Sequence, residues 1–411
     1  MKTLLFLLLF TITLLQAYDL KSLIEAGQQN ELVQAYVNRH HASQKEYDAT
    51  KSSYYPRIDL GASASKVNEK NPFEPGEVYA AFAKANFVIL DGFRRENILD
   101  EKAALTKSSE FDLSGFKKAL SLQITELYFG LQNVKADINA LEQKKKQLAE
   151  QLSRLEKFYS VGIATEDDVE RIKAALANSD YEIVSLRYQE DTLVSKLSLL
   201  TGLQIDELKP GSIKEPSNEQ VNEMDSIRAR SLQSDAMKYK AEQIDAAYYP
   251  SIILEDTYGF YEYGDDDLPP SVGIRADEQN KIMLMLSMNL VDFSAASEQK
   301  QVVLLHQKAL ENQLTYDRKS AAADLALAIQ GIRRAKSLIE AAKLSKSASD
   351  KTFDVVEKKY KARVVDYVKY LDALFQKTQA HSQYNRAVNT LDIAYANYYY
   401  YAGYDPKEFV K

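Results

Sequence analysis

Aliphatic residues recur at alternating steps of four and three along residues 120–155. The positions of this seam are Leu120, Ile124, Leu127, Leu131, Val134, Ile138, Leu141, Lys145, Leu148, Leu152 and Leu155. A period of 3.5 residues is typical of α-helices that supercoil around a neighbouring helix. The pattern therefore predicts a long helix that packs as a coiled coil.

A second helical pattern follows after a break at residues 160–162 and ends before Gly202. Thr165 stands before three acidic residues, which favours it as the N-cap of the second helix. Gly162 lies in the break, where a positive φ would suit glycine. We therefore expect a helical hairpin over about residues 93–202.

The same pattern returns 201 residues further along the chain. Lys145 corresponds to Lys346, Gly202 to Gly403, and Asp91 to Asp292. Self-similarity at a fixed spacing indicates internal duplication. We expect a second helical hairpin over about residues 293–403, so that the chain consists of two repeats.

The hydrophobic period changes from helical to alternating after Pro56 and again after Pro250. Alternation with a period of two is typical of strands with one apolar and one polar face. We expect strands at about residues 57–66, 78–91, 251–262 and 281–292. In the fourth strand, Ile282, Leu284 and Leu286 would share the apolar face.

Four strands are too few to close a barrel, and an open strand edge is not tolerated in lipid. The chain would therefore have to oligomerise. Two copies would give eight strands and a filled lumen, whereas three would give twelve strands and a pore.

The amino-acid composition excludes several kinds of site and partner. The 411 residues include no Cys, which excludes disulfides, thiolate metal sites and lipidation at an N-terminal Cys. The net charge of -7 argues against nucleic acid as a partner. Residues 1–17 read as a secretory signal, and no later stretch is apolar enough for a membrane helix. The histidines lack metal-ligand spacing, and no catalytic or cofactor motif occurs.

These features together resemble the TolC-type outer-membrane efflux proteins over essentially the whole mature length. The resemblance rests on the duplication, on the Tyr-Pro junctions at Pro56 and Pro250, on Asp91 and Asp292, and on the turn sequence that contains Gly162. It implies a mixed α/β membrane protein: a homotrimer with a twelve-stranded outer-membrane barrel that continues into a twelve-helix barrel in the periplasm of a Gram-negative bacterium. The expected partners are the lipid bilayer, a periplasmic adaptor (membrane fusion protein) and an inner-membrane pump of the RND or ABC type.

The resemblance also implies roles for residues at the ends of the two hairpins. Adaptor contact would fall to the tips, at Val161, Gly162, Ile163, Arg363, Val364 and Val365. The tunnel entrance would involve Asp372, Lys369 and Tyr360, and Lys369 stands where some relatives have a second aspartate. The mixed Lys/Asp ring leaves gating and ion preference open.

The expected organisation is a signal peptide at 1–17, repeats at 18–202 and 223–404, an equatorial segment at 203–222 and a tail at 405–411. We expect a passive exit duct and no enzymatic activity. The alternative is a secreted coiled-coil structural protein, which would not explain the alternating strands. Drug, metal and protein export would use the same duct, so the substrate stays open.

Overall fold

The computed structural model describes residues 17–68, 76–217, 220–264 and 276–411. The chain divides into two compact units. The hairpin unit consists of Met1–Ala35, Leu113–Asp225 and Arg318–Lys411, and the sheet unit consists of Tyr36–Asp112 and Ser226–Asp317. The predicted signal sequence lies outside the described residues except for Ala17.

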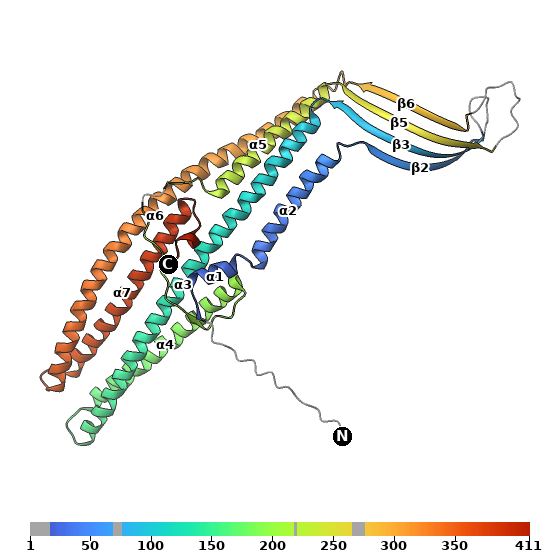
Figure 1. Cartoon of the computed structure of the whole chain (residues 1–411). Helices are drawn as coiled ribbons and strands as arrows, with labels where there is room; N and C mark the ends of the chain where they lie inside the picture. Colours follow the sequence, from blue (N-terminus) through green and yellow to red (C-terminus); the bar gives the residue numbers. More distant parts are fainter. Residues whose placement is uncertain (1–16, 69–75, 218–219, 265–275) are drawn as a thin grey trace, which may run out of the picture. The chain divides into compact units, whose positions relative to one another are not determined.

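Four antiparallel strands in the order β2-β3-β5-β6 form the sheet (Figure 1). Their bounds are Arg57–Lys66 for β2, Glu77–Asp91 for β3, Ser251–Tyr263 for β5 and Glu278–Ser287 for β6. Each chain thus has β2 at one edge and β6 at the other. Residues 265–275, between β5 and β6, lie outside the described residues.

The register places most of the aliphatic residues of the four strands on one face, because directly paired residues point the same way. Leu60 pairs with Ala83, Leu254 pairs with Phe87, and Leu284 pairs with Leu254. The opposite face carries the ion pair between Lys84 and Glu255 (2.5 Å). Apart from Asp256, the middle of the apolar face is uncharged.

The fourth strand is shorter than the sequence predicted. We expected it to continue to residue 292, but β6 ends at Ser287, which pairs with Ser251. Because β5 begins at Ser251, residues beyond Ser287 have no partner on β5. Asp292 instead accepts hydrogen bonds from the backbone N–H groups of Ser294 (3.0 Å) and Ala296 (2.9 Å), which caps the next helix.

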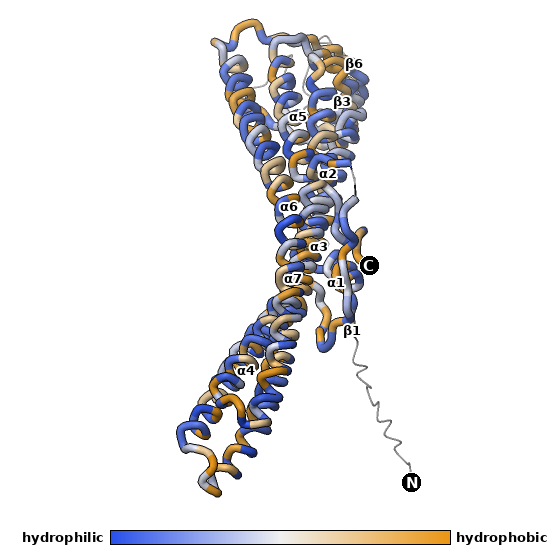
Figure 2. Tube along the Cα trace, turned by 90° about the vertical axis from the view of Figure 1, so that its left-hand side faces the viewer, coloured by the Kyte–Doolittle hydropathy of each residue, from blue (hydrophilic) through white to orange (hydrophobic). Residues whose placement is uncertain are grey.

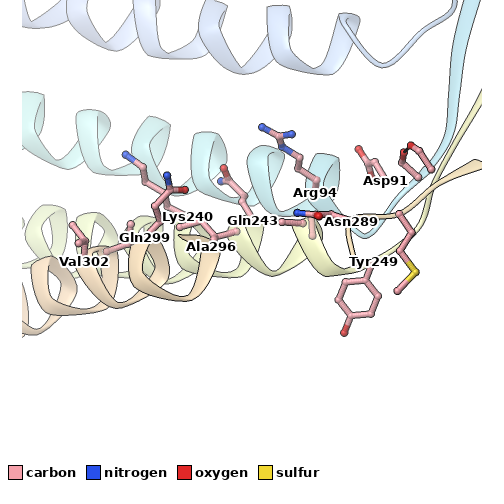
Figure 3. A pocket seen from close by; sticks show the side chains of 16 residues that line it. Asp91, Arg94, Lys240, Gln243, Tyr249, Asn289, Ala296, Gln299 and Val302 are labelled. Atoms are coloured by element: carbon pink, nitrogen blue, oxygen red, sulfur yellow. Dashed lines mark hydrogen bonds between the residues drawn. The ribbon is translucent and has the colours of Figure 1, made fainter. Parts of the chain in front are cut away.

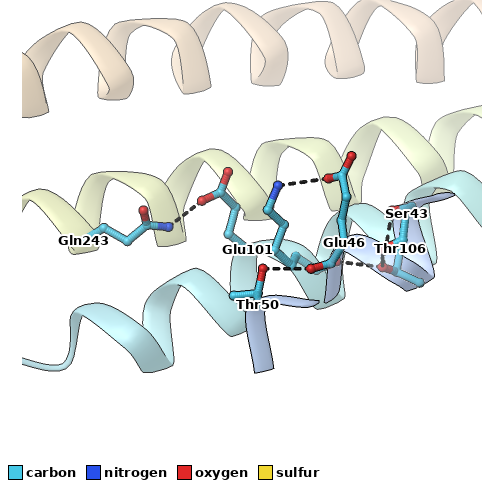
Figure 4. Close-up of polar contacts among 7 residues, drawn as sticks. Ser43, Glu46, Thr50, Glu101, Thr106 and Gln243 are labelled. Carbon is cyan, nitrogen blue, oxygen red and sulfur yellow. Dashed lines mark hydrogen bonds and ion pairs between the residues drawn. The ribbon is translucent and has the colours of Figure 1, made fainter. Parts of the chain in front are cut away.

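Helices continue from the sheet in the same order as the strands. They are α2 (Glu31–Ser52), α3 (Arg94–Ser160), α5 (Asp225–Asp245) and α6 (Ala295–Lys361). Lys102 of α3 pairs with Glu46 of α2 (3.0 Å), Gln243 of α5 donates to Glu101 of α3 (Figure 4), and Lys300 of α6 pairs with Asp245 of α5 (2.7 Å). These polar contacts fix the helix order α2-α3-α5-α6 within the sheet unit.

The hairpin unit contains two long helical hairpins. The first joins α3 to α4 (Glu166–Thr201), and the second joins α6 to α7 (Tyr367–Tyr401). The predicted seam is largely buried, as at Ile124, Leu131 and Leu148. Hydrophilic and hydrophobic residues alternate along the long helices (Figure 2). No helix in the described ranges combines the length and the hydropathy needed to cross a membrane.

The segment between the hairpins packs against both chain ends in the hairpin unit. β4 (Glu207–Leu208) pairs in parallel with β1 (Ala17–Tyr18), which precedes α1 (Leu20–Gly27). Ile213 bridges to Val410, and its N–H donates to Asp392 (2.7 Å). Short 3-10 helices complete the chain, η1 at Ala246–Tyr248 and η2 at Pro406–Phe409.

Candidate functional site

The first tip is a compact turn between α3 and α4. Ile163 N–H donates to the carbonyl of Phe158 (2.8 Å) and Gly162 N–H to that of Tyr159 (3.0 Å). Gly162 has φ 74°, the positive value expected from the sequence. The Thr165 side chain accepts a hydrogen bond from Asp168 N–H (3.3 Å), which confirms it as the N-cap of α4.

The second tip repeats this geometry without a glycine. Val364 N–H donates to Lys359 (2.8 Å) and Arg363 N–H donates to Tyr360 (2.9 Å). Arg363 takes the left-handed conformation, with φ 62°. The N-cap is Asp366, which accepts from Lys369 N–H (2.9 Å).

The tips expose apolar side chains and contact one another. Val161, Ile163 and Val364 are 65%, 57% and 71% exposed, whereas Val365 is half-buried. The Arg363 guanidinium lies over the ring of Phe158, 5.0 Å from its centre. A cation–π contact therefore joins the second tip to the end of α3.

The three residues expected at the tunnel entrance lie in two different environments. Asp372 and Lys369 are exposed on α7, and Asp372 accepts a hydrogen bond from Gln376 of the same helix (3.0 Å). Tyr360 is half-buried and stacks on Tyr370, with ring centres 4.9 Å apart. Tyr360 therefore belongs to an internal cluster, whereas Asp372 and Lys369 are free to face solvent or another copy.

Three tyrosines form that cluster, which the sequence did not predict. Tyr367 lies 5.8 Å from Tyr360 and 5.9 Å from Tyr370 between ring centres. Burial raises the pKa of Tyr360 and Tyr367 and raises the pKa of Tyr370 to about 12. All three hydroxyls are therefore neutral at physiological pH, and the cluster behaves as apolar surface with polar edges.

The tyrosines pack into a core shared by both hairpins. Helices α3 and α4 contribute only aliphatic members, whereas all the aromatic members come from α6 and α7. The core includes Leu148, Leu155, Val169, Ile172, Phe353, Tyr367, Tyr370, Ala373 and Leu374. The hydroxyl of Tyr367 is buried and has no hydrogen-bond partner in the described part of the chain. This core holds the two hairpin ends together near the tips.

Comparison with known proteins identifies a matching family and similar outer-membrane proteins. Residues 23–203 match the family described as "Outer membrane efflux protein". The outer membrane protein TolC of Salmonella enteritidis is 22% identical over 408 residues, which cover 93% of this chain and 82% of TolC. Residues 23–203 thus match the outer membrane efflux protein family, and the chain as a whole is similar to TolC.

Solved structures show that the TolC-type fold extends over nearly the whole chain. The outer membrane protein VceC of Vibrio cholerae superposes with a TM-score of 0.81 at 15% identity, covering 94% of this chain and 96% of VceC. The CmeC outer membrane channel of Campylobacter jejuni gives a TM-score of 0.82 at 13% identity, covering 93% of this chain and 85% of CmeC.

The family match and the TolC-type fold together support an outer-membrane efflux channel. The matched relatives are channel proteins rather than enzymes, which agrees with the expectation of a non-enzymatic role.

Proposed function

We propose that the chain forms the exit duct of a tripartite efflux or type I secretion system in the outer membrane of a Gram-negative bacterium. The observation that carries this proposal is the sheet of one chain, which has an apolar face, a polar face and two open edges. Open edges are not tolerated in lipid, so three copies would close β2 of one chain against β6 of the next. The resulting twelve-stranded barrel would place its polar face around a pore.

The dimensions of the apolar face fit a bilayer. From Ile252 to Phe260, β5 extends about 27 Å, which at a tilt of about 40° gives a height of roughly 21 Å. Outer-membrane barrels have an apolar band of about 25 Å with aromatic residues at its borders. Phe260, exposed towards the far end of β5 on the apolar face, supplies an aromatic residue for one such border.

The hairpin ends would contact a periplasmic adaptor, which is in turn bound to an inner-membrane pump. Two equivalent tips expose the apolar residues Val161, Ile163 and Val364. In a trimer these would form a ring of six apolar tips. The paired segments near Glu207 and Val410 would form a belt around the middle of the helical barrel.

Tip substitutions test the proposed role in a host where this chain is the sole outer-membrane channel. Ile163→Asp and Val364→Asp should abolish export at normal trimer abundance, because the adaptor would have to desolvate a charge in each apolar contact. Lys173→Asp adds negative charge to an exposed position of the same hairpin and should leave export unchanged. Normal export by both tip variants at normal abundance would refute adaptor docking at the tips.

A further inference from the structure

A groove of about 920 Å³ lies in the sheet unit where the strands meet the helices (Figure 3). Helix α5 contributes Lys240, Gln243 and Ile244 to its lining, α3 contributes Arg94, and α6 contributes Gln299 and Val303. Because α5 lies between α3 and α6, one chain builds the groove from three adjacent helices. The volume is within the usual range of about 300–1,000 Å³ for small-molecule sites.

The groove opens on the polar side of the sheet. Its strand end is lined by Asp91, Ser251 and Ser287. Ser251 pairs with both of the others in the sheet register, and its hydroxyl lies 2.7 Å from that of Ser287. These residues share the face of Glu255 and Lys84, which is opposite to Leu254 and Leu284. In the proposed barrel, the groove therefore faces the conduit and not the lipid.

The groove carries unneutralised positive charge. Neither Arg94 nor Lys240 forms an ion pair with any residue that the structure describes, whereas Asp91 of the lining and Asp245 beside it are each already paired. Asp91 pairs with Arg95 (3.0 Å), and Asp245 pairs with Lys300 (2.7 Å). In a chain with a net charge of -7, two free cations in one groove favour an anionic ligand.

Apolar side chains line the same groove beside the cations. Ile244 of α5, Val302 and Val303 of α6, and Met288 after β6 contribute aliphatic surface. The amides of Asn289 and Gln299 supply additional hydrogen-bond donors. A ligand that contacts both the cations and the apolar side chains would have an anionic head and an apolar body.

We propose that this groove is a contact site on the conduit wall for single-chain anionic amphiphiles, such as long-chain carboxylates. The inference rests on the proposed function, because that function places the polar sheet face around the conduit. Arg94 and Lys240 bind the carboxylate, and the apolar residues of α5 and α6 contact the chain of the amphiphile. Three such grooves would line the conduit of a trimer.

The absence of Trp from the chain allows a contact assay with a single reporter. Ala247→Trp places one indole on the groove lining, since Ala247 is an exposed residue of that lining. The full-length variant in nanodiscs is titrated with dibromostearate, whose bromines quench indole fluorescence on contact. Dibromostearate methyl ester is the neutral control, and nanodiscs made with dibrominated phosphatidylglycerol test a bilayer source.

We expect dibromostearate to quench at about tenfold lower concentration than its methyl ester. Adding Arg94→Gln and Lys240→Gln should remove that difference, whereas Lys102→Gln with Lys308→Gln, which removes two cations outside the groove lining, should preserve it. Brominated bilayer lipid should not quench.

Equal quenching by acid and ester, or quenching unaffected by Arg94→Gln with Lys240→Gln, would overturn the proposal. So would quenching by the brominated bilayer lipid, which would place the groove against the membrane. Failure of the proposed function would instead appear before any probe is added, as failure of the unmodified chain to enter nanodiscs.

Discussion

The two helical hairpins have nearly the same backbone but different side chains. Helices α3 and α6 each contain 67 residues, and the two tips make the same backbone hydrogen bonds 201 residues apart. Yet the first tip turns at Gly162 and the second at Arg363. In the shared core, α3 and α4 contribute mostly aliphatic residues, whereas α6 and α7 contribute Phe353 and the tyrosines.

The equivalent lysines within the two seams show the same divergence. Lys145 pairs with Asp180 of α4 (2.5 Å), whereas Lys346 lies over the ring of Tyr384 of α7, 4.9 Å from its centre. Each hairpin thus accommodates its lysine with a different partner. Helix caps and turn hydrogen bonds thus give the two hairpins the same backbone conformation. Their side chains differ, because the packing partners of each hairpin are different.

The largest effect on membrane insertion is expected on the apolar face of the sheet. Strands from both halves of the chain contribute to this face, and in the proposed barrel both would contact lipid. Leu284→Arg in the second half and Ala83→Arg in the first should both impair membrane insertion, at a cost of about 2–4 kcal/mol near the bilayer midplane. Met283→Arg, which points to the polar face beside Glu255, is the control and should insert normally. Insertion is measured as the folded fraction in the outer membrane.

Tolerance of Ala83→Arg together with failure of Leu284→Arg would mean that the two halves of the sheet face different surroundings. Equal effects of Leu284→Arg and Met283→Arg would contradict the assignment of the two faces.

A smaller effect should come from the tyrosines that only the second hairpin supplies. The pKa of Tyr370 is about 12 in the folded chain and about 10 when unfolded. Its stabilising contribution is fully present below pH 10 and is lost as the pH rises towards 12, because the unfolded chain ionises first. The loss should reach roughly 2–3 kcal/mol.

Thermal unfolding followed by circular dichroism at pH 9 and pH 11.5 measures this loss. The wild type should lose more of its Tm between the two pH values than a Tyr367→Phe/Tyr370→Phe variant, which cannot ionise there. The same Tm decrease in both proteins would exclude the tyrosine cluster as its source.

The smallest effect is expected from exchanging the turn residues. Gly162→Arg should destabilise the first tip by about 1 kcal/mol, because a side chain at positive φ strains the backbone. No steric clash should add to this cost, since a Cβ there would meet no atom within 4 Å. Arg363→Gly should be nearly neutral, since relief of a similar strain offsets loss of the Phe158 contact, worth about 0.5–1 kcal/mol. Proteolytic cleavage rates at each tip report both changes. Marked destabilisation by Arg363→Gly would show that the Phe158 contact outweighs the strain.

The features that could be predicted from the sequence are helix ends, helix caps and turns, which depend on neighbouring residues. Helix α2 ends at Ser52, before Pro56, and β2 begins at Arg57 directly after it. Thr165 caps α4, and Gly162 has the expected positive φ. Each depends on neighbouring residues alone. The apolar side of the sheet was also predictable, because alternation determines which residues share a face.

Features that depend on distant partners were not predictable. The end of β6 is set by the start of β5 at Ser251, and the packing of Tyr360 against Tyr370 depends on how α6 meets α7. The contact of Arg363 with Phe158 joins residues far apart in the sequence. The groove between α3, α5 and α6 likewise has no sequence motif.

Cross-linking of the two sheet edges tests the central claim, that copies of the chain close into one barrel. The sequence contains no Cys, so single cysteines placed along β2 and β6, beginning with Leu60→Cys and Leu284→Cys in one chain, give an unambiguous pattern. The account predicts that oxidation in intact outer membranes yields covalent species that end at the trimer. A series that ends at the dimer, or no cross-link at any pair of positions in folded protein, would contradict it.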